Sequence, residues 1–152
     1  LVGAAMVVSD VVSAAMMLYF LVYFVLGFLV VSSLMAAVGA ACNTLKEAQG
    51  LMAPLTVGLV VPMAAWFYIA QHPNGTFAIA LSFIPPITPM VMVIRLAADP
   101  ELAAGQIAAT IGLLVVSVPA VMWASAKIFR TGILMYGKPA SIRELARWIR
   151  YR

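Results

Sequence analysis

The sequence predicts an all-α integral membrane protein with about three transmembrane helices, a proline-split re-entrant hairpin on the outer side and a C-terminal amphipathic helix. Of its 152 residues 65% are hydrophobic and 9% charged, with a mean hydropathy of +1.10, whereas soluble domains are roughly 45–50% apolar and about 25% charged. Residues 11–45, 48–94 and 102–126 contain no Asp, Glu, Lys or Arg, and each run exceeds the ~20 residues a crossing helix needs. Because these runs do not alternate in polarity, they favour helices over barrel strands. A soluble enzyme, a disordered chain and a nucleic-acid-binding module are excluded.

The N-terminal part predicts one complete span. Residues 1–13 are interpreted as the end of a truncated span and an outer loop, because they are apolar but interrupted by polar residues. A membrane domain covers residues 14–133, and its first span lies at about residues 14–42. The second half of this span is rich in small residues, which let helix backbones approach closely inside a membrane. The residues we expect to pack against neighbouring helices are Ser32, Ala36, Gly39 and Ala40.

A short polar break, residues 43–50, separates this span from the next. The second span is predicted at about residues 51–70. Pro54 and Pro62 lie inside it, and proline usually kinks a helix because it removes a backbone hydrogen bond. We therefore expect a bent second span.

Residues 77–96 are apolar but divided by three prolines, Pro85, Pro86 and Pro89. Each half is too short to cross a bilayer, so the segment is interpreted as a re-entrant hairpin, and one kinked span is the alternative. Arg95 lies at its end. A charge at membrane depth is a functional candidate by default; the favoured alternative places this arginine at the outer interface, with Asp99 and Glu101 as its nearest partners.

The last span is predicted at about residues 106–129, followed by a basic tail helix at residues 134–152. Residues 127–152 carry seven of the nine basic side chains and one of the five acidic ones. Since cytoplasmic flanks of spans are rich in Lys and Arg, we expect the tail inside and the hairpin outside. The sequence from Ser141 to Glu144 is a capping box that begins a short amphipathic helix suited to the membrane surface. Its anchor residues would be Arg143, Arg147, Trp148 and Arg150, and docking on a cytoplasmic partner is the alternative.

The sequence contains no catalytic motif and no metal-binding pattern, so no catalytic residue, metal or bound cofactor is predicted. The single cysteine, Cys42, excludes an internal disulfide framework, and we expect it to be a small buried hydrophobic residue. The single histidine, His72, lies in a turn and is expected to be exposed to water.

Two segments carry a family resemblance. FIPPITPMVMVIR, from Phe83 to Arg95, and GILMYGK, from Gly132 to Lys138, occur in an order and spacing that resemble the C-terminal membrane half of type-2 ABC exporter permeases. The nearest branch is the NatB-like sodium-efflux group, and the resemblance covers about residues 19–152. It implies a permease of the plasma membrane, multi-pass with a cytoplasmic C-terminus, that exports sodium or a small molecule.

The resemblance also implies partners and sites. Partners would be a cytoplasmic ABC ATPase that binds and hydrolyses ATP, a second permease copy or the remaining half of the permease, and membrane lipid, but no nucleic acid. Position and resemblance suggest an outer gate at Pro85, Pro86, Pro89 and Arg95. They suggest a cytoplasmic contact at Lys46, Glu47 and Gln49. The alternative function is a non-transporting membrane scaffold or assembly subunit.

Overall fold

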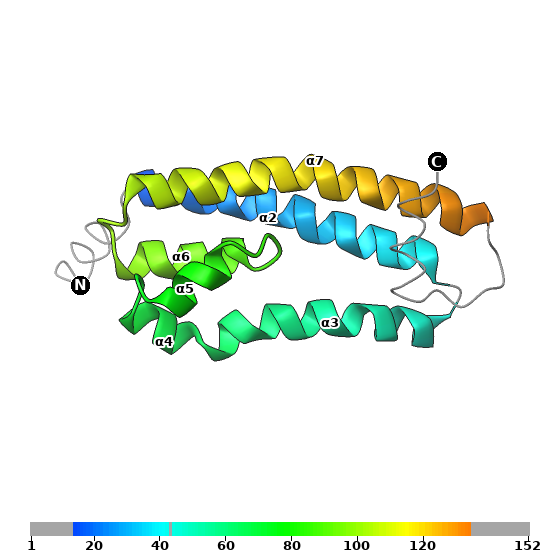
Figure 1. Ribbon diagram of the computed structural model, residues 1–152, viewed down its shortest axis with the longest axis horizontal. Helices are drawn as coiled ribbons and strands as arrows, with labels where there is room; N and C mark the ends of the chain where they lie inside the picture. Colours follow the sequence, from blue (N-terminus) through cyan, green and yellow to red (C-terminus); the bar gives the residue numbers. More distant parts are fainter. Residues whose placement is uncertain (1–13, 43, 135–152) are drawn as a thin grey trace, which may run out of the picture.

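A computed structural model describes residues 14–42 and 44–134, with side chains described for residues 15–42 and 44–130. Within those residues all regular secondary structure is helical (Figure 1), which confirms the predicted all-α class. Residues 1–13 and the predicted tail helix, with Arg143, Arg147, Trp148 and Arg150, lie outside the described part. The helices are α2 (Ala14–Ala41), α3 (Leu45–Ala64), α4 (Trp66–Gln71), α5 (Thr76–Ser82), α6 (Thr88–Ala98) and α7 (Ala104–Leu134).

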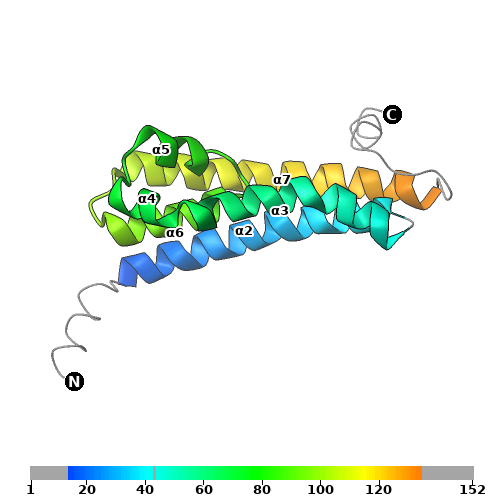
Figure 2. The same ribbon diagram turned by 90° about the horizontal axis from the view of Figure 1, so that it is seen from below.

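Helices α2 and α7 form the long axis of the molecule. They lie side by side and run in the same direction (Figures 1 and 2), and no other pair of helices packs so extensively. Ala15–Ala41 and Ala104–Arg130 are both long and apolar enough to cross a membrane, and few of their side chains are buried within this chain. Large apolar groups such as Phe20, Phe24 and Val116 are at least half exposed. This surface suits contact with lipid or another protein chain, because exposing so large an apolar area to water is unfavourable.

The face of α2 that packs on α7 is defined by buried residues about seven positions apart. Tyr23 and Val30 are fully buried in one cluster with Leu114 of α7, and Ala37 is 7% exposed. The Ser125 hydroxyl donates to the Ser33 carbonyl oxygen at 2.7 Å, which joins the two helices farther along. Ser33 lies in the half of α2 that is rich in small residues.

The four predicted packing residues lie off this face: by helical spacing Ser32 and Gly39 are on the opposite side of α2, and Ala36 and Ala40 lie between the two sides. Ser32 and Ala40 are partly buried, whereas Ala36 and Gly39 are exposed, and a Cβ added at Gly39 would meet nothing within 4 Å. Their packing role therefore stays a prediction that concerns a neighbour outside this chain.

The second helix begins earlier than predicted. Residues 45–50 were expected in a polar break, but they form the first turns of α3. Thr44 is the reason: its hydroxyl accepts a hydrogen bond from the Glu47 backbone N–H at 3.3 Å and caps the helix. The helix bends at Ala65, three residues after Pro62, and continues as α4. Because its first turns are polar, α3 is not among the described helices that are long and apolar enough to cross a membrane. The second span therefore stays a prediction.

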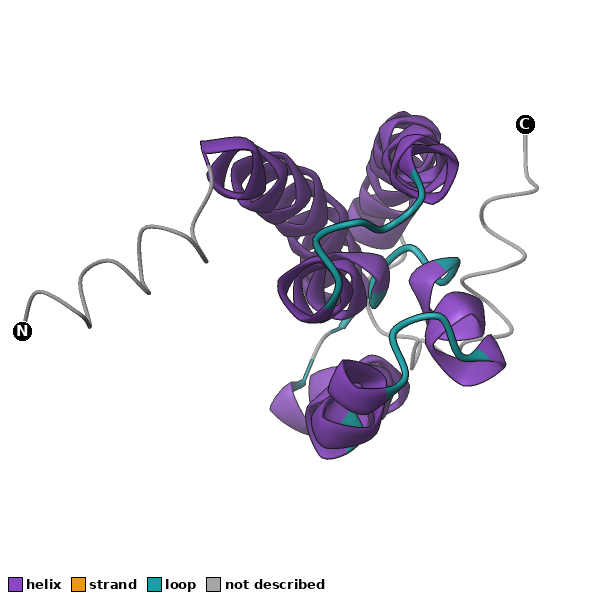
Figure 3. Ribbon diagram, turned by 90° about the vertical axis from the view of Figure 1, so that its left-hand side faces the viewer, coloured by secondary structure: helices purple, strands orange, loops and turns teal. Residues whose placement is uncertain are grey.

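Helices α4, α5 and α6 gather at one end of α2 and α7, which we call the hairpin end. Helix α5 runs inward from this end and α6 returns to it (Figure 1), which is the path of a hairpin rather than of one kinked span. The view onto this end shows helices joined by loops in the described part of the chain (Figure 3). The 11 residues of α6 extend about 16 Å, roughly half of the ~30 Å hydrocarbon core. The opposite end, where α2 and α7 finish and α3 begins, carries Lys46, Lys127 and Arg130; we call it the basic end.

Candidate functional site: the hairpin and its two attachments

The tip of the hairpin is closed by a buried threonine. Helix α5 ends at Ser82 and α6 begins at Thr88, with Pro85 and Pro86 partly buried in the turn between them. The Thr88 hydroxyl lies 2.8 Å from the Ser82 carbonyl oxygen and 2.9 Å from that of Ile84, and the residue is fully buried. The Ser82 carbonyl lies at the end of α5, and Pro86, four positions on, has no N–H to donate to it. The Ile84 carbonyl also accepts from the backbone N–H groups of Ile87 and Thr88, both at 2.8 Å. Both carbonyl oxygens at the turn therefore have a hydrogen-bond donor within the hairpin.

The first attachment fixes the tip of the hairpin to α2. Pro89 lies in the first turn of α6, where its missing N–H removes no helical bond. Its ring packs directly on the backbone of α2 at Gly27. A Cβ at position 27 would lie 2.5 Å from Pro89 Cγ and 2.8 Å from Pro89 Cβ. Only glycine allows this close contact, and the sequence reasoning did not select Gly27.

The second attachment is Arg95. Its side chain is fully buried between neighbouring helices. Its Nε donates to the Pro73 carbonyl oxygen at 2.6 Å, Nη1 donates to Ser82 Oγ at 2.9 Å, and Nη2 donates to Gln106 Oε1. Nη1 also lies 3.5 Å from the Met92 sulfur. One guanidinium thereby joins the α4–α5 turn, α5, α6 and α7.

The expected acidic partners of Arg95 bind elsewhere. Asp99 accepts from Asn74 Nδ2 at 2.9 Å and from the Glu101 backbone N–H at 3.1 Å, which ties the loop before α7 to the loop before α5. Arg95 thus takes neutral atoms as its hydrogen-bond partners in the described part of the chain. A buried charge with neutral partners only is costly.

A chain of hydrogen bonds continues from Arg95 to α2. Gln106 binds Arg95 through its side chain, and its backbone carbonyl oxygen accepts from Thr110 Oγ1 at 2.9 Å. Thr110 Oγ1 lies 2.7 Å from the Tyr23 hydroxyl, and both residues are fully buried. The hairpin is therefore connected to both long helices.

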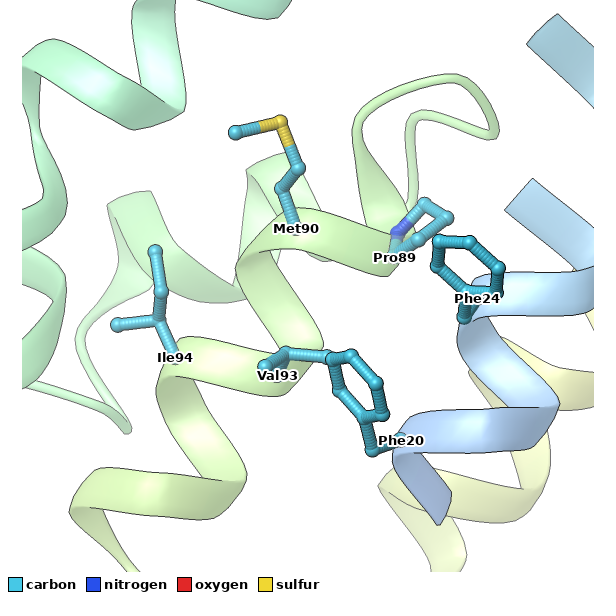
Figure 4. Close-up of a pocket in the computed structure, with 6 residues that line it drawn as sticks. All are labelled: Phe20, Phe24, Pro89, Met90, Val93 and Ile94. Carbon is cyan, nitrogen blue, oxygen red and sulfur yellow. The ribbon is translucent and has the colours of Figure 1, made fainter. Parts of the chain in front are cut away.

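An apolar groove of about 290 Å³ lies between α2 and α6 (Figure 4). Phe20 and Phe24 form one wall, and α6 forms the other. The lining residues of α6 are Pro89, Met90, Val93 and Ile94. They lie on the side of α6 away from Arg95 by helical spacing, so the groove and the buried charge occupy opposite faces of one helix.

Comparison with known proteins identifies the family. The model of the ABC-2 family transporter proteins matches residues 1–127. The chain belongs to the ABC-2 transporter family. It is 26% identical over 149 residues to the uncharacterized protein YhaP of Bacillus subtilis, covering 98% of this chain and 35% of that protein. It is 28% identical over 138 residues to the uncharacterized protein MJ1024 of Methanocaldococcus jannaschii, covering 91% and 34%. The chain thus spans about a third of each relative, and no solved structure matches it significantly.

The predicted contact residues of this ABC-2 transporter chain lie at its basic end. Lys46 and Gln49 are exposed in the first turns of α3 and Glu47 is partly buried. The nearby Cys42 is partly rather than fully buried; burial, and secondarily the charge of Glu47, raise the pKa of its thiol. At the other end His72 is exposed, as predicted, and stacks on Tyr68. Among the described residues no three His, Cys, Asp or Glu side chains cluster as metal ligands.

Proposed function

We propose that this chain forms part of the membrane domain of an ABC exporter, in which a separate cytoplasmic ATPase drives efflux of a small substrate. The match of the ABC-2 model to residues 1–127 supports the permease assignment. A hairpin held at one end of two long apolar helices supports a gate at that end. Pro85 and Pro86 form its turn, Pro89 attaches it to α2, and Arg95 attaches it to α7.

In this proposal the hairpin end is outside and the basic end is cytoplasmic. ATP binding on the partner would move α3 through contacts at Lys46, Glu47 and Gln49, which lie in its exposed first turns. Helix α3 continues through α4 to the hairpin, so a tilt of α3 reaches the hairpin through packed helices. Opening requires α6 to leave Gly27 and Gln106, and closing restores both contacts.

The alternative is a membrane scaffold, in which Ser82, Thr88 and Asn74 would face lipid headgroups or partners. Ser82 and Thr88 are instead fully buried and hydrogen-bonded within the hairpin. Asn74 is exposed and binds Asp99. The two buried residues favour a hairpin that is internally stable and can move as one unit.

The experiment is purification of the full-length permease from its native membrane, followed by reconstitution with the ATPase that accompanies it. We expect an ATPase to co-purify and ATP to drive efflux from vesicles, with a Walker-A lysine variant of that ATPase as the inactive control. Radioactive sodium and a panel of small organic molecules are tested as substrates, because the resemblance suggests the NatB-like branch. A protein that purifies without an ATPase, or vesicles without ATP-driven efflux of any member of the panel, would support the scaffold instead.

A further inference from the structure

The donors of Arg95 are arranged as an oxyanion-binding edge. In a guanidinium, Nε–H and the outer N–H of Nη2 point in the same direction, and this edge binds the two oxygens of a carboxylate or phosphate. Here Nε donates to the Pro73 carbonyl oxygen and Nη2 to Gln106 Oε1. Two neutral oxygens from separate elements therefore occupy the places of the two oxygens of one anion.

We infer that Arg95 recognises an anionic group on the exported substrate, and that Pro73 and Gln106 occupy its binding edge while the hairpin is closed. This inference rests on the proposed function and adds the substrate class, a molecule that carries a carboxylate or a phosphate. The recognised chemistry is the planar pair of negatively charged oxygens.

The third donor of Arg95 explains why the charge stays with the hairpin. Nη1 binds Ser82 Oγ, and Ser82 and Arg95 both belong to the hairpin. Gln106, in contrast, belongs to the first turn of α7. When α6 moves away from α7, Nη2 loses its acceptor, while Nη1 keeps Ser82 and Nε keeps the Pro73 carbonyl just before α5. The edge of the guanidinium then has an unused donor at the end of the molecule where the substrate leaves. An oxyanion therefore binds Nη2 first and takes the second place on the edge from the Pro73 carbonyl.

The surroundings give this donor a preference for an anion. The nearby carboxylate, Asp99, is engaged by Asn74 and by the Glu101 backbone. Asp99 attracts the Arg95 charge without a hydrogen bond to it, and the hydrogen bonds of the guanidinium go to neutral atoms among the described residues. A ligand that brings a negative charge to these donors therefore gains more than a neutral one. A cation at the same place would be repelled.

The test measures ATP hydrolysis by the full-length permease–ATPase complex in proteoliposomes, with four probes on one ten-carbon chain. Decanoate and decyl phosphate carry the oxyanion, decanol is neutral and decyltrimethylammonium is cationic. We expect stimulation by the first two only. Acetate and inorganic phosphate test whether a free oxyanion suffices, and vesicles of phosphatidylglycerol against phosphatidylcholine test whether a lipid headgroup supplies it. Stimulation by any of these oxyanion sources supports the inference, and equal stimulation by decanol or the cationic probe overturns it.

Three substitutions test the role of the binding edge. Arg95→Lys keeps the charge but loses the planar edge, and should raise the half-stimulating decanoate concentration about tenfold or more while maximal stimulation persists. Gln106→Met removes the competing oxygen and should lower that concentration. Gln106→Glu places a carboxylate on Nη2 and should abolish stimulation. Arg130→Lys, at the exposed basic end, is the matched control and should change nothing.

The outcomes separate the two levels of the proposal. Arg95→Lys could fail to fold, which its melting temperature in detergent would show. In that case the two Gln106 variants still test the anion inference, because they change the competing acceptor and leave the arginine in place. An active complex whose half-stimulating decanoate concentration is the same in all variants, or one that transports only sodium, overturns the anion inference and leaves the exporter function intact. Loss of the ATPase on purification overturns the proposed function itself.

Discussion

The contact between Gly27 and Pro89 gives the sharpest test of how the hairpin is held. Gly27→Ala would place a methyl group 2.5 Å from Pro89 Cγ, and the proline ring cannot rotate away. Alanine is favoured over glycine inside a helix by about 1 kcal/mol, whereas overpacking costs about 1–3 kcal/mol. We therefore expect Gly27→Ala to change the free energy of unfolding by between about zero and 2 kcal/mol, in the destabilising direction.

Gly39→Ala is the matched control on the same helix. Nothing lies within 4 Å of the methyl group that it adds, so only the helix propensity acts and the variant should be up to about 1 kcal/mol more stable. The assay compares the unfolding of both variants in detergent. The expected gap between them, about 1–3 kcal/mol, is the cost of the clash alone.

A double-mutant cycle locates the clash. Pro89→Gly removes the two ring atoms that the new methyl group would clash with, Cγ at 2.5 Å and Cβ at 2.8 Å. It should therefore cancel the cost of Gly27→Ala, with a coupling energy of about 1–3 kcal/mol, and show none with Gly39→Ala. If Gly27→Ala is as stable as Gly39→Ala, or if Pro89→Gly fails to rescue it, the hairpin does not lie on α2 at this point.

Three further predictions concern other contacts. Arg95→Met should lower stability by about 1–3 kcal/mol, because it removes the donor from the Pro73 carbonyl and the Gln106 amide, whereas the Ser82 hydroxyl still donates to the Ala78 carbonyl. Faster proteolysis at residues 83–87 would report the loosened hairpin, and an unchanged rate would contradict it. Tyr23→Phe should cost only about 0.6 kcal/mol, because Thr110 keeps its bond to the Gln106 carbonyl; a much larger loss of melting stability would assign Tyr23 another role. Because the pKa of the Cys42 thiol is raised, its thiolate fraction at pH 7 is low and maleimide labelling should accelerate as the pH rises. Glu47→Gln should lower that pKa and speed labelling at pH 7, and an equal rate in both proteins would exclude the carboxylate as a cause.

The long elements could be predicted from the sequence because their cause is local. Long runs without charge predicted the first and last spans within a few residues of α2 and α7, and three prolines predicted the division of the hairpin. The predicted start of the second helix was wrong, although the sequence contains the N-cap signal for the observed start. Thr44 and Glu47 form the same capping pattern that predicted the tail helix, but the polar side chains of residues 43–50 were interpreted as a loop.

The attachments of the hairpin could not be predicted, because they depend on residues far apart in the chain. The acceptors of Arg95 include Pro73, 22 positions away, which offers a backbone carbonyl and leaves no side-chain signal. The expectation of Asp99 and Glu101 as partners followed charge alone. Gly27 could have been questioned, since a glycine inside a helix often marks a close approach, but nothing in the sequence indicated Pro89 as the neighbour.

The parallel course of α2 and α7 has a consequence for biosynthesis. Tyr23 and Thr110, which join them, are 87 positions apart, and ribosomes add roughly 5–20 residues per second. The earlier helix therefore spends on the order of 4–20 s in the translocon or bilayer before its partner is made. During that interval the tyrosine hydroxyl has no Thr110 to bind. It therefore needs another hydrogen-bond partner, from water, lipid headgroups or the translocon, until the last helix is made.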